Sequence, residues 1–250
     1  MICIKSAQDL ASMRTAGLIL AEILEKVRNA IKEGVATIEL DNLSRRLMKD
    51  AGVESAFLGY RGYPANICVS VNDEIVHGIP GPRILKSGDI VSLDMGVKHQ
   101  GFYSDAAVTV GIGKLDLKAK QLIEITKEAL MRGIKQMKPD ARLSDISAAI
   151  QEYSESFGFG VVRQFVGHGI GRELHEEPEI PNFGQRGRGP LLKVGMVLAI
   201  EPMINAGTWE CKVLDDGWTA VTKDGLCSAH WEHTVALTDK GPEILTKYYA

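Results

Sequence analysis

Apolar positions at helical spacing predict the first two elements of the chain. Small or apolar residues that recur every three or four positions indicate one buried face of a helix. Six residues follow this spacing: Met13, Gly17, Leu20, Leu24, Val27 and Ile31. Ser6 to Asp9 resembles a capping box that opens the helix, with Asp in place of Glu. We expect Gly34 to end this helix and Thr37 to cap a second one that runs to about Gly52.

Strand patterns and a second pair of helices follow. The first two strand patterns cover residues 67–71 and 90–110. A long helix is predicted over residues 117–137, where Pro139 stops it, and another from Ser144 or Asp145 to about Gly158. Further strand patterns cover residues 161–162, 196–200, 218–222 and 233–237. Two helices followed by strands therefore occur twice.

This repeated order indicates an internal duplication. Lys86–Asp94 and Lys193–Glu201 share the pattern Lys-x-Gly-x-(Ile/Val)-x-x-(Leu/Ile)-acid at an offset of 107 residues. Gly52 and Gly158 stand at nearly the same offset, 106 residues apart. The repeat predicts an α+β fold of two pseudo-symmetric halves, roughly residues 1–112 and 113–250. Acids that end corresponding strands are expected to meet where the halves join.

Length and composition are compatible with one globular domain over residues 1–250, which the candidate chemistry below makes a catalytic one. The chain has 250 residues, of which 45% are hydrophobic and 24% charged, so it has enough apolar residues for a sizeable core. A net charge of −3 gives no general attraction to nucleic acid or anionic lipid. The chain contains no apolar run of about 18–20 residues and no apolar signal core near Met1. We expect a cytoplasmic monomer with no nucleic-acid specificity and no membrane partner.

The first candidate chemistry lies on a predicted β-hairpin. Residues 90–97 and 102–110 are strand-like, and a four-residue loop at 98–101 would place Asp94 directly opposite Asp105. Opposed residues have Cβ atoms only about 5 Å apart, so two carboxylates would repel each other unless a proton or cation lay between them. A slipped register with two exposed aspartates is equally compatible with the hairpin alone.

Two further acids make a metal site the better interpretation. Glu201 ends the apolar strand pattern 197–200, where an unpaired buried charge would be costly. Glu232 lies in the strand-like segment 230–237 and corresponds to Asp105 in the duplicated scheme. Four carboxylates from two halves carry a charge of about −4, which two divalent cations neutralise.

Histidines complete the candidate set. His168 lies in a glycine-rich turn at residues 166–171, and beside four carboxylates it is a plausible nitrogen ligand. A nitrogen ligand favours Mn, Fe, Co or Zn over Ca²⁺ or Mg²⁺. His77 and His175 lie in tight turns, where ordinary loop positions are the alternative. His230 and His233 are expected to point to the face opposite Glu232 and are assigned no chemistry.

The ordered acids and His168 resemble the metal ligands of the methionine aminopeptidases and their relatives with the pita-bread fold. The similarity includes Asn72 and the motifs at residues 59–64, 77–80, 94–96, 104–105, 167–171, 175–178, 201–203, 216–218 and 232–234. It extends over nearly the whole chain and points to the compact type I enzymes. The resemblance implies an antiparallel sheet covered by helices and a hydrolase that removes the N-terminal methionine from nascent peptides, near the ribosome.

The resemblance also implies a role for each ligand. Asp94 would chelate one metal ion and His168 the other, and Asp105 and Glu232 would bridge the two. Glu201 would bind the ion on the His168 side and transfer protons. The two divalent ions would generate a nucleophilic hydroxide and polarise the scissile carbonyl.

By the same resemblance, other residues would bind the substrate. His77 and His175 would hydrogen-bond the peptide and the developing oxyanion. The pocket for the methionine side chain would consist of Phe57, Tyr60, Tyr63, Cys68, Leu174, Met203 and Trp218. Phe57 and Leu174 depart from the residues common in the family, Cys and Phe, and Asn182 stands where a His is frequent. These departures alter the pocket and leave the chemistry intact.

Two alternatives share the fold. An X-Pro aminopeptidase or prolidase would use the same five ligands, but such enzymes usually carry an extra N-terminal domain. A catalytically inert peptide-binding module would be expected to lack some ligands, whereas all five are present, together with His77 and His175.

Overall fold

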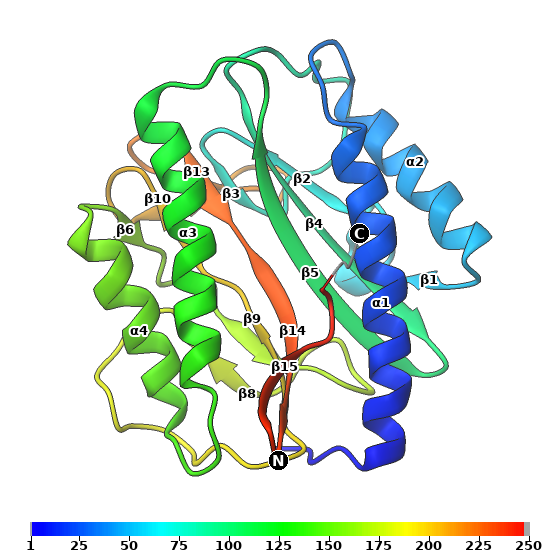
Figure 1. Cartoon of the computed structure of the whole chain (residues 1–250). Helices are drawn as coiled ribbons and strands as arrows, with labels where there is room; N and C mark the ends of the chain where they lie inside the picture. Colours follow the sequence, from blue (N-terminus) through cyan, green and yellow to red (C-terminus); the bar gives the residue numbers. More distant parts are fainter. Residues whose placement is uncertain (1, 248–250) are drawn as a thin grey trace.

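Four helices and a large antiparallel sheet make up the part of the chain that the structure describes. This computed structural model describes residues 2–247 (Figure 1). The predicted domain limits, residues 1 and 250, lie outside that range. The helices are α1 (Ala7–Asn29), α2 (Thr37–Asp50), α3 (Leu117–Gln136) and α4 (Leu143–Ser156), and Tyr60–Gly62 forms a 3₁₀ turn. Within these residues, no helix is both long and apolar enough to cross a membrane.

The main sheet has nine strands, all paired antiparallel. Its continuous path runs through β1 (Glu54–Ser55), β4 (Ile90–His99), β5 (Phe102–Gly111), β14 (Glu232–Thr238), β9 (Val197–Ile200), β7 (Gly167–Gly169) and β8 (Glu176–Ile180). The other two strands pair off this path: β2 (Cys68–Val71) with β4, and β15 (Gly241–Ile244) with β14. The predicted antiparallel α+β architecture is confirmed.

Two small sheets lie beside the main one. One contains β13 (Ser228–His230), β10 (Met203–Asn205) and β6 (Gly160–Val161). The other contains β11 (Cys211–Val213), β12 (Ala220–Thr222) and β3 (Glu74–Val76). The chain leaves β9 for β10 within two residues, and it leaves β13 for β14 after Trp231 alone.

The helix starts follow the predicted capping chemistry more closely than the helix ends. Ser6 caps α1, because its Oγ accepts the Asp9 backbone N–H and the Asp9 carboxylate accepts the Ser6 N–H. The predicted end at Gly34 is wrong, since α1 stops at Asn29. The Gly34 N–H instead donates to the carbonyl of Leu85, which ties the loop to the sheet. Thr37 is the first residue of α2 and not its cap.

Alternation along the strands gives the main sheet one apolar face and one polar face. On β4, residues 91, 93, 95 and 97 pack in the apolar cluster beneath α1 and α2. On β14, Val235 and Leu237 pack in the cluster beneath α3 and α4. Figure 1 shows the two helix pairs over the two halves of the sheet. Side chains at the alternate positions, among them Asp94 and Glu232, therefore point to the face that the helices leave uncovered.

Each helix pair has its own apolar cluster. The buried members beneath α1 and α2 all come from residues 20–112. Those beneath α3 and α4 come from residues 119–237, apart from Ile90. This partition matches the two halves expected from the sequence, and their origin by duplication stays a prediction.

One close contact fixes α1 against the C-terminal segment. A Cβ atom placed on Gly17 would collide with the backbone carbonyl of Leu245. A backbone group cannot move aside as the end of a flexible side chain can. We expect Gly17→Ala to lower the free energy of unfolding by about 1–3 kcal/mol, although Ala favours a helix more than Gly does. Urea unfolding measures this change. Gly81→Ala is the control, because its added Cβ would meet nothing closer than 3.9 Å. Equal stability of Gly17→Ala and the wild type would contradict the packing.

Candidate active site

Five neighbouring strands of the main sheet position one candidate ligand each. Along the order β4, β5, β14, β9 and β7, the residues are Asp94, Asp105, Glu232, Glu201 and His168. Glu201 directly follows β9, and the other four lie within their strands. All five point to the face away from the helices, because their positions have the parity opposite to that of the core residues.

Strand register arranges these residues in two rows. In the first row Asp94 is opposite Ala107, and Ala107 is opposite Glu232. His233 pairs with Ile200, so Glu232 lies beside Glu201, which is the last member of this row. The second row, two residues further along the strands, contains His168 opposite Ala199 and Asp105 opposite Gly96. In the first row, Ala107 therefore separates Asp94 from Glu232, whereas Glu232 and Glu201 are direct neighbours.

The predicted hairpin register is wrong by two residues. Asp94 pairs with Ala107, whereas Asp105 pairs with Gly96. The hairpin loop contains only Gln100 and Gly101, both with positive φ (50° and 81°), as favoured two-residue hairpin turns require. A shift of two residues keeps both aspartates on the same face, since side chains alternate with a period of two. They are diagonal neighbours instead of directly opposed residues.

The carboxylates are buried close together. Asp94, Asp105 and Glu232 are each less than 9% exposed. Donor atoms of Asp105, His168 and Glu232 all lie within 4.8 Å of one another. Burial, and then the neighbouring carboxylates, raise the pKa values of Asp94, Glu201 and Glu232 well above their usual range. Burial likewise raises the pKa of Asp105. Burial is the largest cause of all four shifts, and the neighbouring negative charges add to it for Asp94, Glu201 and Glu232.

His168 presents one ring nitrogen to these acids. Its Nδ1 donates to the carbonyl of Gly169 at 2.9 Å, so the neutral ring carries its hydrogen on Nδ1 and leaves Nε2 as a lone pair. Nε2 lies 3.5 Å from Oε1 of Glu201. Burial lowers the pKa of His168 to about 3, which keeps this nitrogen unprotonated at neutral pH.

The residues present fit divalent metal ions. Oδ1 of Asp94 and Oε1 of Glu232 are buried without a hydrogen-bond partner within the described chain, and such atoms are costly unless something binds them. Across residues 2–247, no lysine or arginine forms an ion pair with any of the four acids. Four carboxylates and one imidazole nitrogen suit Mn, Fe, Co or Zn.

A cavity of about 150 Å³ opens onto this acidic cluster. Its wall includes the five candidate ligands and most of the predicted substrate residues: Phe57, Tyr60, Tyr63, Cys68, His77, Leu174, His175 and Trp218. Met203 is absent from this wall; it is fully buried in a neighbouring apolar cluster. Space of about 150 Å³ holds one benzene molecule in a protein interior, so the cavity suits a single apolar side chain.

Two predicted histidines lie at the cavity. His77 has a left-handed backbone (φ 62°) and packs edge-on against Phe165 and Trp218. Burial, followed by His175, lowers the pKa of His77 to about 4. His175 stacks on Tyr60, and its Nδ1 lies 2.8 Å from the Tyr60 hydroxyl. The ring centroids of His175 and His168 are 4.2 Å apart.

The sequence matches Metallopeptidase family M24 over residues 11–239. The chain belongs to metallopeptidase family M24. Its relatives include a methionine aminopeptidase of Clostridium perfringens, 52% identical over 98% of this chain and 99% of that one. Methionine aminopeptidase 1 of Bacillus subtilis is 50% identical over 99% of this chain and 100% of its own length. The family predicted from the sequence is confirmed, and it implies bound divalent metal ions.

Solved structures of other M24 proteins share the fold. The methionine aminopeptidase of Thermotoga maritima is 49% identical, with a TM-score of 0.98 over 99% of this chain and 100% of that one. A prolidase from Pyrococcus furiosus is 25% identical, with a TM-score of 0.81. It is matched over 99% of this chain but only 66% of its own. The predicted pita-bread fold is confirmed.

Two residues at this M24 site were not predicted. Arg61 lines the cavity, and its guanidinium lies 5.4 Å from the centre of the Tyr60 ring; no pattern in the sequence indicated it. His230 was expected to face away from Glu232, and this prediction is wrong. Its Nε2 lies 3.7 Å from Oε2 of Glu201. The spacing carried a signal, since residues two apart in a strand share a face.

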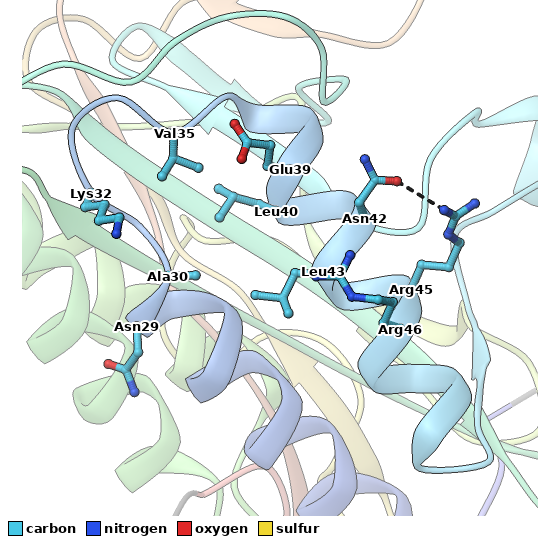
Figure 2. A pocket seen from close by; sticks show the side chains of 10 residues that line it. All are labelled: Asn29, Ala30, Lys32, Val35, Glu39, Leu40, Asn42, Leu43, Arg45 and Arg46. Carbon is cyan, nitrogen blue, oxygen red and sulfur yellow. Dashed lines mark hydrogen bonds between the residues drawn. The ribbon is translucent and has the colours of Figure 1, made fainter.

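A second cavity, of about 520 Å³, lies between the end of α1 and α2 (Figure 2). Glu39 is its only lining carboxylate, and that side chain accepts the backbone N–H of Ala36 at the start of α2. Arg45 is hydrogen-bonded to Asn42 (Figure 2). With one engaged acid and no histidine, this cavity offers no metal site, so the smaller cavity remains the candidate active site.

The raised carboxyl pKa values predict that removing one buried charge stabilises the metal-free protein and weakens metal binding. In metal-free protein the cost of burying Asp94 is absent below pH 3.8 and grows as the pH rises toward the raised pKa of the folded state. We therefore expect Asp94→Asn to raise the melting temperature of chelator-treated protein at pH 8, by about 2–4 °C for each kcal/mol relieved. The gain should be smaller at pH 4.

The same substitution should abolish the stabilisation that Mn²⁺ gives the wild type, which is about 2.7 kcal/mol at 100 times the dissociation constant. Thermal unfolding with chelator and with Mn²⁺ measures both effects. Asp239→Asn, at an exposed turn after β14, is the control and should change neither. A destabilised metal-free Asp94→Asn that keeps its response to Mn²⁺ would contradict the charge cluster.

Proposed function

We propose that this metallopeptidase removes the N-terminal methionine from peptides and proteins by hydrolysis. The proposal rests on one cavity, large enough for a single side chain, that has an apolar wall on one side and the five candidate metal ligands on the other. Relatives named methionine aminopeptidase, about 50% identical over their full length, support it. An acidic end to the cavity also favours a substrate that presents a free amino group, because the ammonium charge is complementary to the carboxylates.

The acidic cluster would hold two divalent ions. Asp94 would bind one of them and His168 the other, while Asp105 and Glu232 would bind both and Glu201 would bind the ion on the His168 side. The central position of Glu232, between strands that carry Asp105 and Glu201, supports its bridging role. When bound, divalent ions supply Lewis-acid polarisation of a carbonyl and activation of water. Mn, Fe, Co and Zn all suit these ligands.

The apolar wall binds the methionine side chain. Phe57, Tyr63 and Trp218 contact one another edge to face, with ring centroids 6.5 Å apart for the first pair and 5.1 Å for Tyr63 and Trp218. An unbranched thioether fills irregular apolar space and makes favourable sulfur–aromatic contacts. Leu174 and Cys68 complete this part of the wall. Met203, outside the wall, contributes only by packing.

His77 and His175 orient the peptide as hydrogen-bond donors. Their lowered pKa values leave both rings neutral at pH 7. The Tyr60 hydroxyl lies 2.8 Å from Nδ1 of His175. In the tautomer that this role requires, the hydroxyl donates to Nδ1 and the His175 hydrogen is on Nε2, where it stabilises the carbonyl oxygen as negative charge develops. The Glu201 carboxylate accepts a proton from the attacking water and delivers it to the leaving amine.

Nascent chains are the natural source of such substrates. Every new chain begins with methionine, and the free amino end must be accessible to enter a cavity of this size. We therefore place the protein in the cytoplasm, near the ribosome, as a monomer. Relatives named methionine aminopeptidase come from bacteria, which supports the cytoplasmic assignment.

Metal reconstitution tests the proposed reaction. Chelator-treated protein should release no methionine from Met-Ala-Ser, and addition of Mn²⁺, Fe²⁺, Co²⁺ or Zn²⁺ should restore release. Asp94→Asn and His168→Ala should stay inactive at the same ion concentrations. Chromatographic detection of free methionine measures the rate. Faster cleavage of an X-Pro peptide would favour the prolidase alternative, and full activity of either variant would disprove the ligand assignment.

Cys68 tests the pocket separately from the metal. Burial, followed by Asp94, raises the pKa of its thiol, so the group is neither a nucleophile nor a thiolate ligand. We expect Cys68→Ser to retain activity. Cys68→Leu adds bulk to the wall and should raise KM for Met-Ala-Ser about 10-fold or more, as pocket changes of one or two methylenes do. Steady-state kinetics at saturating Mn²⁺ measure both, and inactivation by Cys68→Ser would contradict this role.

A further inference from the structure

His230 is a buried polar side chain that the proposed reaction does not use. It is 1% exposed, and neither Nδ1 nor Nε2 has a hydrogen-bond partner within the described residues. A buried polar group without a partner costs about 1–3 kcal/mol. His233, three positions along, has its Nδ1 2.9 Å from Oγ1 of Thr246 and so avoids this cost. The cost at His230 indicates that its ring has a partner in the working enzyme.

The chain path brings His230 to the edge of the candidate metal site. His230 ends β13 and pairs with Met203 of β10 in a small sheet. Only Pro202 and Trp231 separate these two residues from Glu201 and Glu232 of the main sheet, and the Trp231 N–H donates to the Pro202 carbonyl at 3.3 Å. The switch between sheets therefore holds the His230 ring next to Glu201.

Glu201 lies between two histidines. Its Oε1 is 3.5 Å from Nε2 of His168, and its Oε2 is 3.7 Å from Nε2 of His230. The first distance joins two groups that would bind one ion. The second joins a carboxylate oxygen to a nitrogen that can carry a hydrogen, and a movement of less than 1 Å would bring the pair to the 2.7–2.9 Å of a charge-assisted hydrogen bond.

We propose that His230 is a positioning residue that donates a hydrogen bond from Nε2 to Oε2 of Glu201 and so reserves Oε1 for the ion. The inference rests on the proposed function, because it assumes that Glu201 binds a metal. A carboxylate held at one oxygen binds an ion through the other and does not rotate to bind through both. Partners that orient metal ligands in this way typically contribute 10–100-fold to metal affinity.

Calorimetric titration of chelator-treated protein with Mn²⁺ tests the inference. His230→Leu removes the donor and should weaken the binding of one ion by about 10–100-fold while the number of ions bound stays the same. His230→Gln keeps an N–H donor and should bind close to wild-type affinity. His233→Gln is the matched control, because it changes a histidine on the opposite face of β14, and its affinity should not change.

Stability and kinetics separate positioning from a structural role. Metal-free His230→Leu should melt no lower than the wild type, because Leu replaces a polar group that has no partner. At saturating Mn²⁺ its kcat for Met-Ala-Ser should fall while KM changes by less than about twofold, because a misoriented Glu201 stabilises the transition state less well while peptide binding stays the same. A lower melting temperature with unchanged metal affinity would overturn the inference in favour of packing.

Three other outcomes would overturn it. Wild-type affinity in His230→Leu would show that Glu201 needs no support, and equal weakening in His230→Gln would show that the donor is not what matters. Loss of one whole ion, with a changed absorption spectrum of the Co²⁺ form, would make His230 a metal ligand itself. The binding experiment needs no peptide. An enzyme that binds Mn²⁺ as described but releases no methionine would refute the proposed function and leave this inference standing.

Discussion

Repulsion between four buried carboxylates is the constraint on which the rest of this structure depends. Asp94, Asp105, Glu201 and Glu232 converge on one face of the sheet with no lysine or arginine paired to them across residues 2–247. Bringing them together costs free energy that the helix-covered face must offset through apolar burial. The two apolar clusters under the helix pairs supply that burial. Bound cations relieve this repulsion, and the relief contributes to the free energy of metal binding.

Strand geometry converts this constraint into a site of defined shape. One ligand on each of five adjacent strands gives a spacing set by the sheet and not by loops, which favours a rigid arrangement. Gly96, Ala107 and Ala199 are cross-strand neighbours of the ligands. A Cβ on Gly96 would approach Ala56 and Phe57 to 3.0 Å or less, so this position beside Asp105 requires glycine.

The sequence predicted the parts of this site that depend on local periodicity. Alternation placed Asp94 and Asp105 on one face even though the loop length, and with it the register, was wrong by two residues. His168 was proposed as a ligand from its place in a glycine-rich turn beside the four acids, and the resemblance to methionine aminopeptidases added the cavity wall. The prediction for His230 overlooked the period-two spacing that places it on the same face as Glu232. The position of Met203 depends on the change of sheet at Pro202, a tertiary feature that strand spacing cannot predict. Arg61 reaches the cavity through a positive-φ turn (φ 48°), which has no apolar pattern.

Anomalous X-ray diffraction from crystals soaked in Mn²⁺ would test the central claim most directly. The account predicts two peaks within bonding distance of Asp94, Asp105, His168, Glu201 and Glu232, with Asp105 and Glu232 contacting both. A single peak would contradict the pair of ions. Peaks elsewhere, or none at an ion concentration that supports methionine release, would contradict the claim that these five residues form the metal site.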